Sequence, residues 1–411
     1  MAVMAHEGQA GPIDAEGAVV CTLRPSCSAT FRIRHTRQGN YKSTPGLEYS
    51  PDSSARLMAS PSSGSPAKGK IVVCRDMGKE AMGILKHSGY ELVVWPETTP
   101  PPRSWVLDNV KDAAGICVMM ADRVDDELLD AAGPNLKVVS TFSVGYDHFD
   151  TMAIKARNIR AGHTPGVLND AVADTAVLLV LMAMRRAGEA IKLVQDGQWP
   201  QTPWSPFLLT GPALSRASLT IGFLGFGRIS QCTLHRLLAF TQPPTSATPL
   251  PRCIYTSSRA RSNQGEIDQE HTRKFGVEVT RVEAQVLAAQ SDVLIVLCSL
   301  NESTKGMVNE AFLNLMKRDS VLINVARGPI VDSDALANAL RDSKIFAAGL
   351  DVIAGEPNIP ADHPLVLEPK CVVLPHIGSA DRESRNGMAV LCARNVVAGV
   401  EGAAMPAELS L

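Results

Sequence analysis

Three charged residues of this chain each follow an apolar run, and together they offer side chains suited to carbonyl chemistry. They are Arg327, Glu356 and His376. An arginine can hold a carboxylate through two parallel charge-assisted bonds, and a histidine oriented by an acid can donate a proton to a carbonyl oxygen. In an open parallel sheet, side chains beyond the carboxyl ends of different strands face one crevice. The trio therefore predicts a site that binds a small 2-oxo acid and protonates its carbonyl.

A glycine turn upstream of the trio suits a dinucleotide. The apolar run Leu219–Leu224 leads into Gly225-x-Gly227, and a helical pattern over Gln231–Leu238 follows. Gly225 permits a tight turn, and Gly227 lets the backbone approach a pyrophosphate that the helix N-terminus then binds. Ser230 occupies the position of the usual third glycine, where a small residue can suffice. The strand–turn–helix context predicts a Rossmann-type cofactor site.

A stretch without acids indicates which cofactor binds. An NAD site usually carries an acid about 20 residues after the first glycine, where it binds the ribose 2′-hydroxyl. No acid lies between Gly225 and Glu266, whereas Arg259 and Arg261 follow the apolar run Cys253–Thr256. Two arginines suit a 2′-phosphate, which a carboxylate would repel. We expect NADPH, with NADH as the weaker alternative; the competing interpretation is a solvated loop.

The elements that must position these residues alternate between short apolar runs and helical spacings from about residue 70 onward. This alternation predicts an α/β fold with two doubly wound parallel sheets. The predicted strands are Ile71–Cys74, Leu92–Trp95, Ile116–Met119 and Val138–Thr141, then Leu219–Leu224, Cys253–Thr256, Val293–Cys298, Val321–Val325, Ala347–Asp351 and Val372–Leu374.

The predicted domain organisation is an insertion. We expect a Rossmann cofactor domain at 166–377 inserted into a flavodoxin-like substrate domain made of 69–165 and 378–411. The helical stretch Met388–Val400 would otherwise have nothing to pack on. Asp170–Arg186 is the predicted long helix at the junction. In the Pro-rich segment that follows, Trp199 and Trp204 are expected to pack internally, with a pocket wall or a subunit contact as alternatives.

Two segments have no predicted role. Residues 1–68 show no sustained apolar period and include a Ser/Pro/Gly-rich stretch, so we expect a disordered or non-native extension. Arginines without nearby acids in this extension leave mitochondrial import as an alternative to the expected cytoplasmic location. Thr241–Pro251 is a Pro-rich insertion where a short connection is usual.

Composition narrows the classes of partner. The formal net charge of -2 indicates neither nucleic acid nor an anionic membrane as a partner. The nine cysteines include no C-x-x-C pair, so we expect no zinc site and no disulfide framework, and a reducing compartment.

Several separate segments resemble the D-isomer-specific 2-hydroxyacid dehydrogenases, and within them most closely the glyoxylate/hydroxypyruvate reductases. They are Leu-Lys-Val-Val-Ser-Thr-Phe-Ser-Val-Gly-Tyr-Asp-His at 136–148, Ala-Ala-Gln-Ser-Asp at 288–292, Cys-Ser-Leu at 298–300 and the tail Met-Pro-Ala-Glu-Leu-Ser-Leu. Together with the segments of the trio, they recur in the family's order over residues 70–411. The resemblance implies a homodimer that reduces glyoxylate and hydroxypyruvate to glycolate and D-glycerate. The expected preference for NADPH comes from the arginines after Cys253–Thr256 and not from the resemblance.

The resemblance also implies a role for each site residue. Arg327 would hold the substrate carboxylate, His376 would protonate the C2 oxygen, and Glu356 would accept the other imidazole N–H. Val144 and Gly145 would offer backbone contacts to the substrate. The cofactor would contact Gly225, Gly227, Arg228 and Ile229 at the pyrophosphate and Ser299, Val325, Asp351 and Gly378 at the nicotinamide half.

One segment departs from the family pattern, and two alternatives stay open. Residues 171–174 read Ala-Val-Ala-Asp where the family often has a hydroxyl and a glutamate, and loss of the hydroxyl would weaken a nicotinamide contact.

The first alternative function is a dehydrogenase for another 2-oxo acid. The second is a dinucleotide-sensing, corepressor-like binding protein on the same fold, which can keep the same trio.

Overall fold

A computed structural model describes residues 68–216, 218–241 and 250–411. The predictions for the N-terminal extension, apart from Lys68, and for most of the Thr241–Pro251 insertion lie outside these residues. None of the helices in the described ranges is long and apolar enough to cross a bilayer.

The first sheet has five parallel strands in the order β2-β1-β3-β4-β5, which is the flavodoxin-like order. Its four predicted strands are present within a few residues, whereas β5 and the short helices α2 and α4 were not predicted. The elements are β1 (Lys70–Val73), α1 (Lys79–His87), β2 (Glu91–Val94), α2 (Arg103–Asn109), β3 (Ala113–Val118), α3 (Asp126–Ala132), β4 (Val138–Thr141), α4 (Thr151–Ala156) and β5 (Arg160–Gly162).

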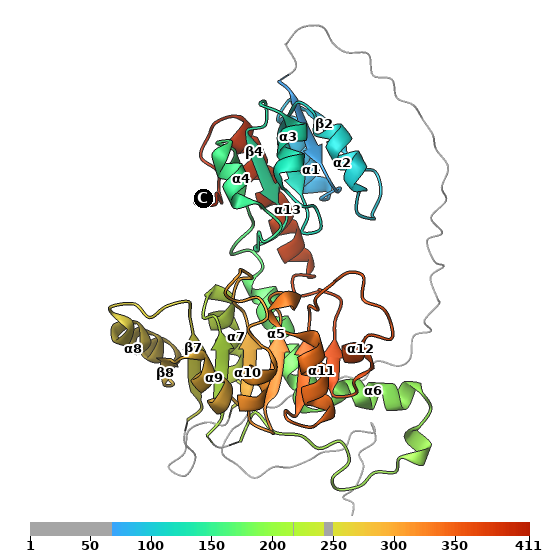
Figure 1. The fold of residues 1–411 in the computed structure, drawn as a ribbon, viewed down its shortest axis with the longest axis vertical. Coiled ribbons are helices and arrows are strands. Elements are labelled where there is room, and N and C mark those ends of the chain that lie inside the picture. Colours follow the sequence, from blue (N-terminus) through green and yellow to red (C-terminus); the bar gives the residue numbers. More distant parts are fainter. Residues whose placement is uncertain (1–67, 217, 242–249) are drawn as a thin grey trace, which may run out of the picture. The chain divides into compact units, whose positions relative to one another are not determined.

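The C-terminal helix α13 (Arg382–Val400) packs on this first sheet, against α1, β3 and β4, as Figure 1 shows. The approach is close because Gly115 of β3 has no side chain; a Cβ there would lie 2.8 Å from Cγ1 of Val396. The helix begins at Arg382 rather than at the predicted Met388. Asp381 caps it by accepting a bond from the Ser384 N–H at 2.6 Å.

The second sheet has seven parallel strands in the order β12-β11-β10-β9-β6-β7-β8. Counted from β6, this is the Rossmann order with one further strand, and the α/β prediction of two parallel sheets is confirmed. β8 was not predicted. The strands are β6 (Thr220–Leu224), β7 (Arg252–Thr256), β8 (Val279–Arg281), β9 (Val293–Val296), β10 (Val321–Asn324), β11 (Ala347–Leu350) and β12 (Cys371–Val373).

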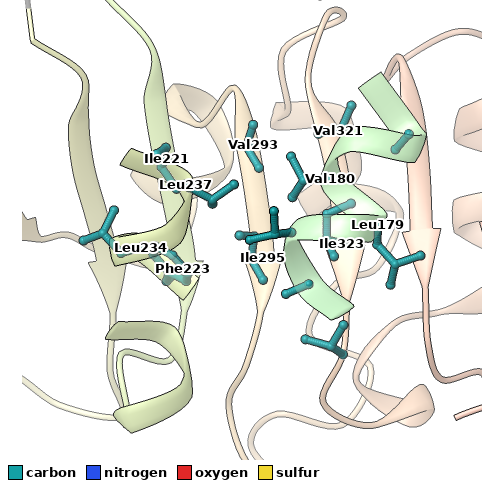
Figure 2. Packing of buried hydrophobic residues seen from close by; sticks show 14 of the residues in the cluster. Leu179, Val180, Ile221, Phe223, Leu234, Leu237, Val293, Ile295, Val321 and Ile323 are labelled. Carbon is teal, nitrogen blue, oxygen red and sulfur yellow. The ribbon is translucent and has the colours of Figure 1, made fainter. Parts of the chain in front are cut away.

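Helices cover both faces of the central strands, which is why these strands are apolar without alternation. On β9, Val293 and Ile295 join the core beneath α5 (Asn169–Met184), as Figure 2 shows. Leu294 and Val296 of the same strand join the core on the opposite face. The other helices of this unit are α6 (Ala187–Gln195), α7 (Arg228–Leu238), α8 (Gln264–Phe275), α9 (Ala284–Gln290), α10 (Glu310–Leu315), α11 (Ser333–Arg341) and α12 (Pro364–Leu367).

The segment after α6 departs from the prediction of internal packing. Trp199 and Trp204 are 65% and 83% exposed, and Phe207 is 84% exposed. The expectation that these tryptophans fill the interior is therefore wrong. Such large apolar side chains in water are unfavourable unless something covers them.

Candidate active site

His376 and Glu356 form a direct pair. The Nδ1 atom of His376 lies 2.9 Å from Oε1 of Glu356, and the two side chains are 26% and 30% exposed. Because Nδ1 is engaged by the carboxylate, the imidazole is left with Nε2 for a ligand. His376 itself lines a cavity, whereas Glu356 is not among the residues that line it. Glu356 is therefore placed to orient the histidine from behind.

Asp351 holds the backbone around His376. It follows β11, and its buried carboxylate accepts bonds from the N–H groups of Ile377 and Gly378, both at 2.7 Å. His376 has a positive φ of 55°, a conformation that costs a residue with a side chain about 1–2 kcal/mol. Burial raises the pKa of Asp351 above its usual value, although the two N–H groups act in the opposite direction. Asp351 thus fixes a strained turn as well as lining the cavity.

Arg327 follows β10 and lies in the same cavity. Buried Asn324 shapes its turn, because the Asn324 amide donates to the Arg327 carbonyl at 2.9 Å and accepts from the Ala326 N–H at 3.0 Å. The guanidinium donates from Nε to Asp147 at 2.8 Å and from Nη1 to the Ala326 carbonyl at 2.9 Å. Asp147 was not among the predicted site residues.

A loop after β4 presents two backbone N–H groups. The Val144 carbonyl pairs with Nδ1 of His163 at 3.0 Å, and the Gly145 carbonyl accepts from the Ser143 hydroxyl at 2.6 Å. The N–H groups of the same two residues, Val144 and Gly145, have no hydrogen-bond partner among the described residues. Both residues line the cavity, so these donors are available to an anionic or carbonyl oxygen.

A half-buried histidine, His148, holds this loop through hydrogen bonds. Nε2 of His148 lies 2.9 Å from the Thr141 hydroxyl, which in turn lies 2.8 Å from the Ser143 hydroxyl. Burial is the main cause that lowers the pKa of His148 to about 4; Asp147 opposes this and Arg327 adds to it. Burial likewise lowers the pKa of His163. Both imidazoles are therefore neutral at physiological pH and act as parts of the scaffold.

One cavity of about 640 Å³ joins most of the predicted substrate and nicotinamide residues. Segments that follow strands of the first sheet contribute Arg75, Met119 and Met120 to the cavity wall, and α13 contributes Arg385. The predicted residues that line it are Val144, Gly145, Ile229, Ser299, Val325, Arg327, Asp351, His376 and Gly378. The cavity thus brings together residues from loops that follow β4, β9, β10, β11 and β12.

The glycine turn has the form that a pyrophosphate requires. Gly225 has a φ of 90°, and a Cβ there would lie 2.8 Å from the backbone of Cys298, so only glycine fits without strain. Space around Gly227 is open for 4 Å, and the N–H groups of Arg228 and Ile229 have no partner in the described ranges. Ser230 is buried, and its hydroxyl donates to the Gly225 carbonyl at 2.7 Å, which adapts the third position to serine.

Arg259 and Arg261 lie in a second cavity, beyond β7 and beside α8. Both side chains are exposed, and neither forms an ion pair with any described residue. A further arginine underlies this loop: Arg281 is 9% exposed and donates from Nε to the Ser257 hydroxyl at 3.2 Å. Arg281 was not predicted, because it comes from β8, which has too few residues to show a pattern.

The departure at residues 171–174 lies partly away from the cavity. Asp174 accepts from Nε of Arg236 at 2.5 Å, and Asp170 accepts from Nη2 of the same arginine at 2.8 Å. This exposed cluster ties α5 to α7. Of these four residues, Val172 lines the cavity and Asp174 does not. The missing hydroxyl can therefore affect the cavity, whereas the change from glutamate to aspartate lies outside it.

Comparisons with known proteins agree with this geometry. Residues 177–378 match the family described as "D-isomer specific 2-hydroxyacid dehydrogenase, NAD binding domain". A glyoxylate reductase/hydroxypyruvate reductase of Homo sapiens is 41% identical over 343 residues, covering 83% of this chain and 98% of the relative.

Two solved structures extend the agreement to three dimensions. A protein of Thermus thermophilus is 35% identical, with a TM-score of 0.71 and coverage of 83% of this chain and 99% of that chain. An NADPH-dependent glyoxylate/hydroxypyruvate reductase of Sinorhizobium meliloti, in complex with NADP and malonate, is 30% identical. Its TM-score is 0.67, with coverage of 84% and 97%.

Two parallel-sheet units with a glycine turn and a histidine–acid pair define a nucleotide-dependent oxidoreductase of the α/β class. The chain belongs to the D-isomer-specific 2-hydroxyacid dehydrogenase family, whose members are NAD(P)-dependent.

Proposed function

We propose that this protein is an NADPH-preferring reductase of glyoxylate and hydroxypyruvate that forms glycolate and D-glycerate. The observation that carries the proposal is the convergence of His376, Arg327, Val144 and Gly145 on one cavity, where the N–H groups of Val144 and Gly145 have no hydrogen-bond partner among the described residues. The names of the relatives supply the substrate pair.

The chain's own residues have separable tasks in this reaction. Arg327 and the N–H of Gly145 bind the substrate carboxylate, and Nε2 of His376 donates a proton to the C2 oxygen. Glu356 holds the imidazole at Nδ1, so that Nε2 faces the cavity. When bound, the nicotinamide supplies the hydride that reaches C2 as the proton arrives.

The residues around the glycine turn fit such a cofactor. An open approach at Gly227 suits a pyrophosphate, as do the N–H groups at the start of α7, which have no partner in the part of the chain that the structure describes. Ser299, Val325, Asp351 and Gly378 would border the nicotinamide half. The exposed Arg259 and Arg261 would bind the 2′-phosphate, which is the basis for preferring NADPH. We therefore assign 166–377 to cofactor binding and 69–165 with 378–411 to substrate binding.

The deciding test is the absorbance of the reduced cofactor. Purified protein with hydroxypyruvate or glyoxylate should consume NADPH with a higher kcat/KM than NADH. A panel of bulkier 2-oxo acids should react less efficiently. A bulkier acid that reacts best would replace the substrate assignment, and a strong NADH preference would remove the cofactor assignment. Loss of absorbance with none of the acids would favour a dinucleotide-binding protein without this activity.

We also propose a homodimer, in a cytoplasmic location. The apolar side chains of Trp199, Trp204 and Phe207 are exposed in the segment after α6, and a second copy of the chain would cover them. Light scattering on the purified protein should give twice the mass of one chain. A Trp204→Ser/Phe207→Ser variant should shift the protein toward the monomer, whereas an unchanged mass would place the contact elsewhere.

A further inference from the structure

Asp147 is the one carboxylate, among the residues that the structure describes, that contacts the arginine proposed to bind substrate. It follows β4, whereas Arg327 follows β10, and the contact joins loops of the two sheets at 2.8 Å. We propose that Asp147 is a positioning residue that aims the free edge of the Arg327 guanidinium at the substrate carboxylate. This inference rests on the proposed function, since it concerns the same site.

The hydrogen bonds of the Arg327 guanidinium show which of its nitrogen atoms is available to a substrate. Asp147 takes Nε, and the Ala326 carbonyl takes Nη1. Nη2 donates to no described residue and lies directly over Gly145: a Cβ on Gly145 would be only 2.0 Å from it. A carboxylate at this point can accept from Nη2 and from the Gly145 N–H together, since this N–H also has no partner among the described residues. Without Asp147, the long side chain could rotate about its stem and take Nη2 away from Gly145.

The negative charge of Asp147 opposes binding of the substrate carboxylate. Burial is the largest single cause of change in the pKa of Asp147 and would raise it, but the Arg327 guanidinium, together with a backbone hydrogen bond and His148, lowers the pKa overall, so the side chain is ionised at neutral pH. It also lines the cavity that the substrate carboxylate would enter. Two anions would then share one guanidinium. Asp147 thus orients Arg327 at the cost of repelling the substrate, and these two effects can be separated by substitution.

Asparagine is the substitution that separates them. Asp147→Asn keeps an oxygen that can accept from Nε and removes the negative charge. Asp147→Ala removes both. Asp126→Ala is the matched control, because Asp126 also pairs with an arginine, Arg157, at 2.7 Å but lies on the exposed side of α3.

The experiment measures KM and kcat for hydroxypyruvate at saturating NADPH, and the Kd of oxamate by calorimetry on the NADPH-bound protein. Oxamate carries a carboxylate next to a carbonyl and needs no turnover. For Asp147→Ala we expect KM and the oxamate Kd to rise about 10–30-fold, with kcat within about threefold of wild type. For Asp147→Asn we expect both within about threefold, and for Asp126→Ala no change.

Three results would overturn the inference. The first is an unchanged KM and oxamate Kd in Asp147→Ala. The second is an Asp147→Asn variant as impaired as Asp147→Ala, because charge and not orientation would then be the contribution. The third is a parallel loss of kcat, NADPH affinity and thermal stability, which indicates a structural role. A wild-type protein that binds oxamate but reduces neither acid would refute the proposed function and leave the Asp147 comparison measurable.

Discussion

The two arginine sites of this molecule are built in opposite ways. Arg327 is 19% exposed, and both its Nε and its Nη1 atoms are held by named acceptors. Arg259 and Arg261 are exposed, and their side chains form no ion pair with the residues that the structure describes. The first guanidinium is held in place without a ligand, whereas no ion pair among the described residues fixes the two guanidinium groups of the second site.

This difference in organisation predicts different functional contributions from the two sites. A donor that is already held in position can stabilise the charge of the transition state, because it need not reorient during the reaction. A solvated arginine loses side-chain entropy on binding and is screened by salt, so its net contribution is small. We infer that the Arg327 site carries catalysis, and that the Arg259 site selects between two cofactors of similar reactivity.

The largest expected effect is at the histidine. His376→Ala should lower kcat by about 10²–10⁴-fold, because the proton for the C2 oxygen would then come from water. Steady-state reduction of hydroxypyruvate measures it, and His235→Ala on the exposed side of α7 is the control. A near-normal kcat would remove His376 from the reaction and leave only binding at this site.

Arg327→Ala should follow, with a loss of about 100-fold in kcat/KM. The estimate is the value of a hydrogen-bonded charge pair, about 3 kcal/mol. Arg327→Lys should recover only part, because an ammonium cannot bond Asp147, Ala326 and the substrate in the same plane. The control is Arg318→Ala, at an exposed arginine after α10. Full activity in the lysine variant would contradict the geometric part of the comparison.

The scaffold under the Arg327 site predicts a pH dependence of stability. The pKa of His148 is about 4 in the folded protein and about 6.5 in an unfolded chain. Between these values the unfolded chain binds more protons, so stability is lost as pH falls from about 6.5 toward 4. At about pH 5 the loss from this residue is at most about 2 kcal/mol.

Thermal unfolding at about pH 7.5 and pH 5 tests this expectation. His148→Asn should narrow the difference in Tm between the two conditions, because asparagine does not titrate. His87→Asn, at the exposed end of α1, should leave that difference unchanged. If both variants behave like wild type, the loop that carries Val144 and Gly145 does not depend on a neutral His148.

The smallest effect is expected at the second site. Arg259→Ala and Arg261→Ala should each lower the ratio of kcat/KM for NADPH over NADH by about tenfold, through the loss of one charge-assisted contact. The NADH values should not change. Arg273→Ala, on the exposed face of α8, is the matched control. If the ratio stays constant, these arginines belong to a solvated loop and the comparison with Arg327 fails.

Much of the fold could be predicted because the signals are local. Each buried strand is an uninterrupted apolar run, and the glycine turn combines a strand, two glycines and a helix in a short segment. The elements that were missed are short or polar, such as β5 and β8 with three residues each. The trio at Arg327, Glu356 and His376 was visible because each residue ends such a run. The roles assigned to the trio stay predictions.

The residues that hold the site together could not be predicted in the same way. Asp147 is an ordinary polar residue in sequence, and its partner Arg327 lies 180 positions away. His148 and Asn324 bond to residues only 7 and 3 positions away, but neither belongs to a periodic pattern or a motif that would single it out. The sequence alone determined the sheet-forming runs, the glycine turn, the family and the reactive side chains, because each depends on nearby residues. Only the tertiary structure decided that Asp147 meets Arg327, and that Arg259 and Arg261 form no ion pair within the described residues. Such contacts depend on which strand ends adjoin after the sheets have formed, and this information is not contained in any single segment.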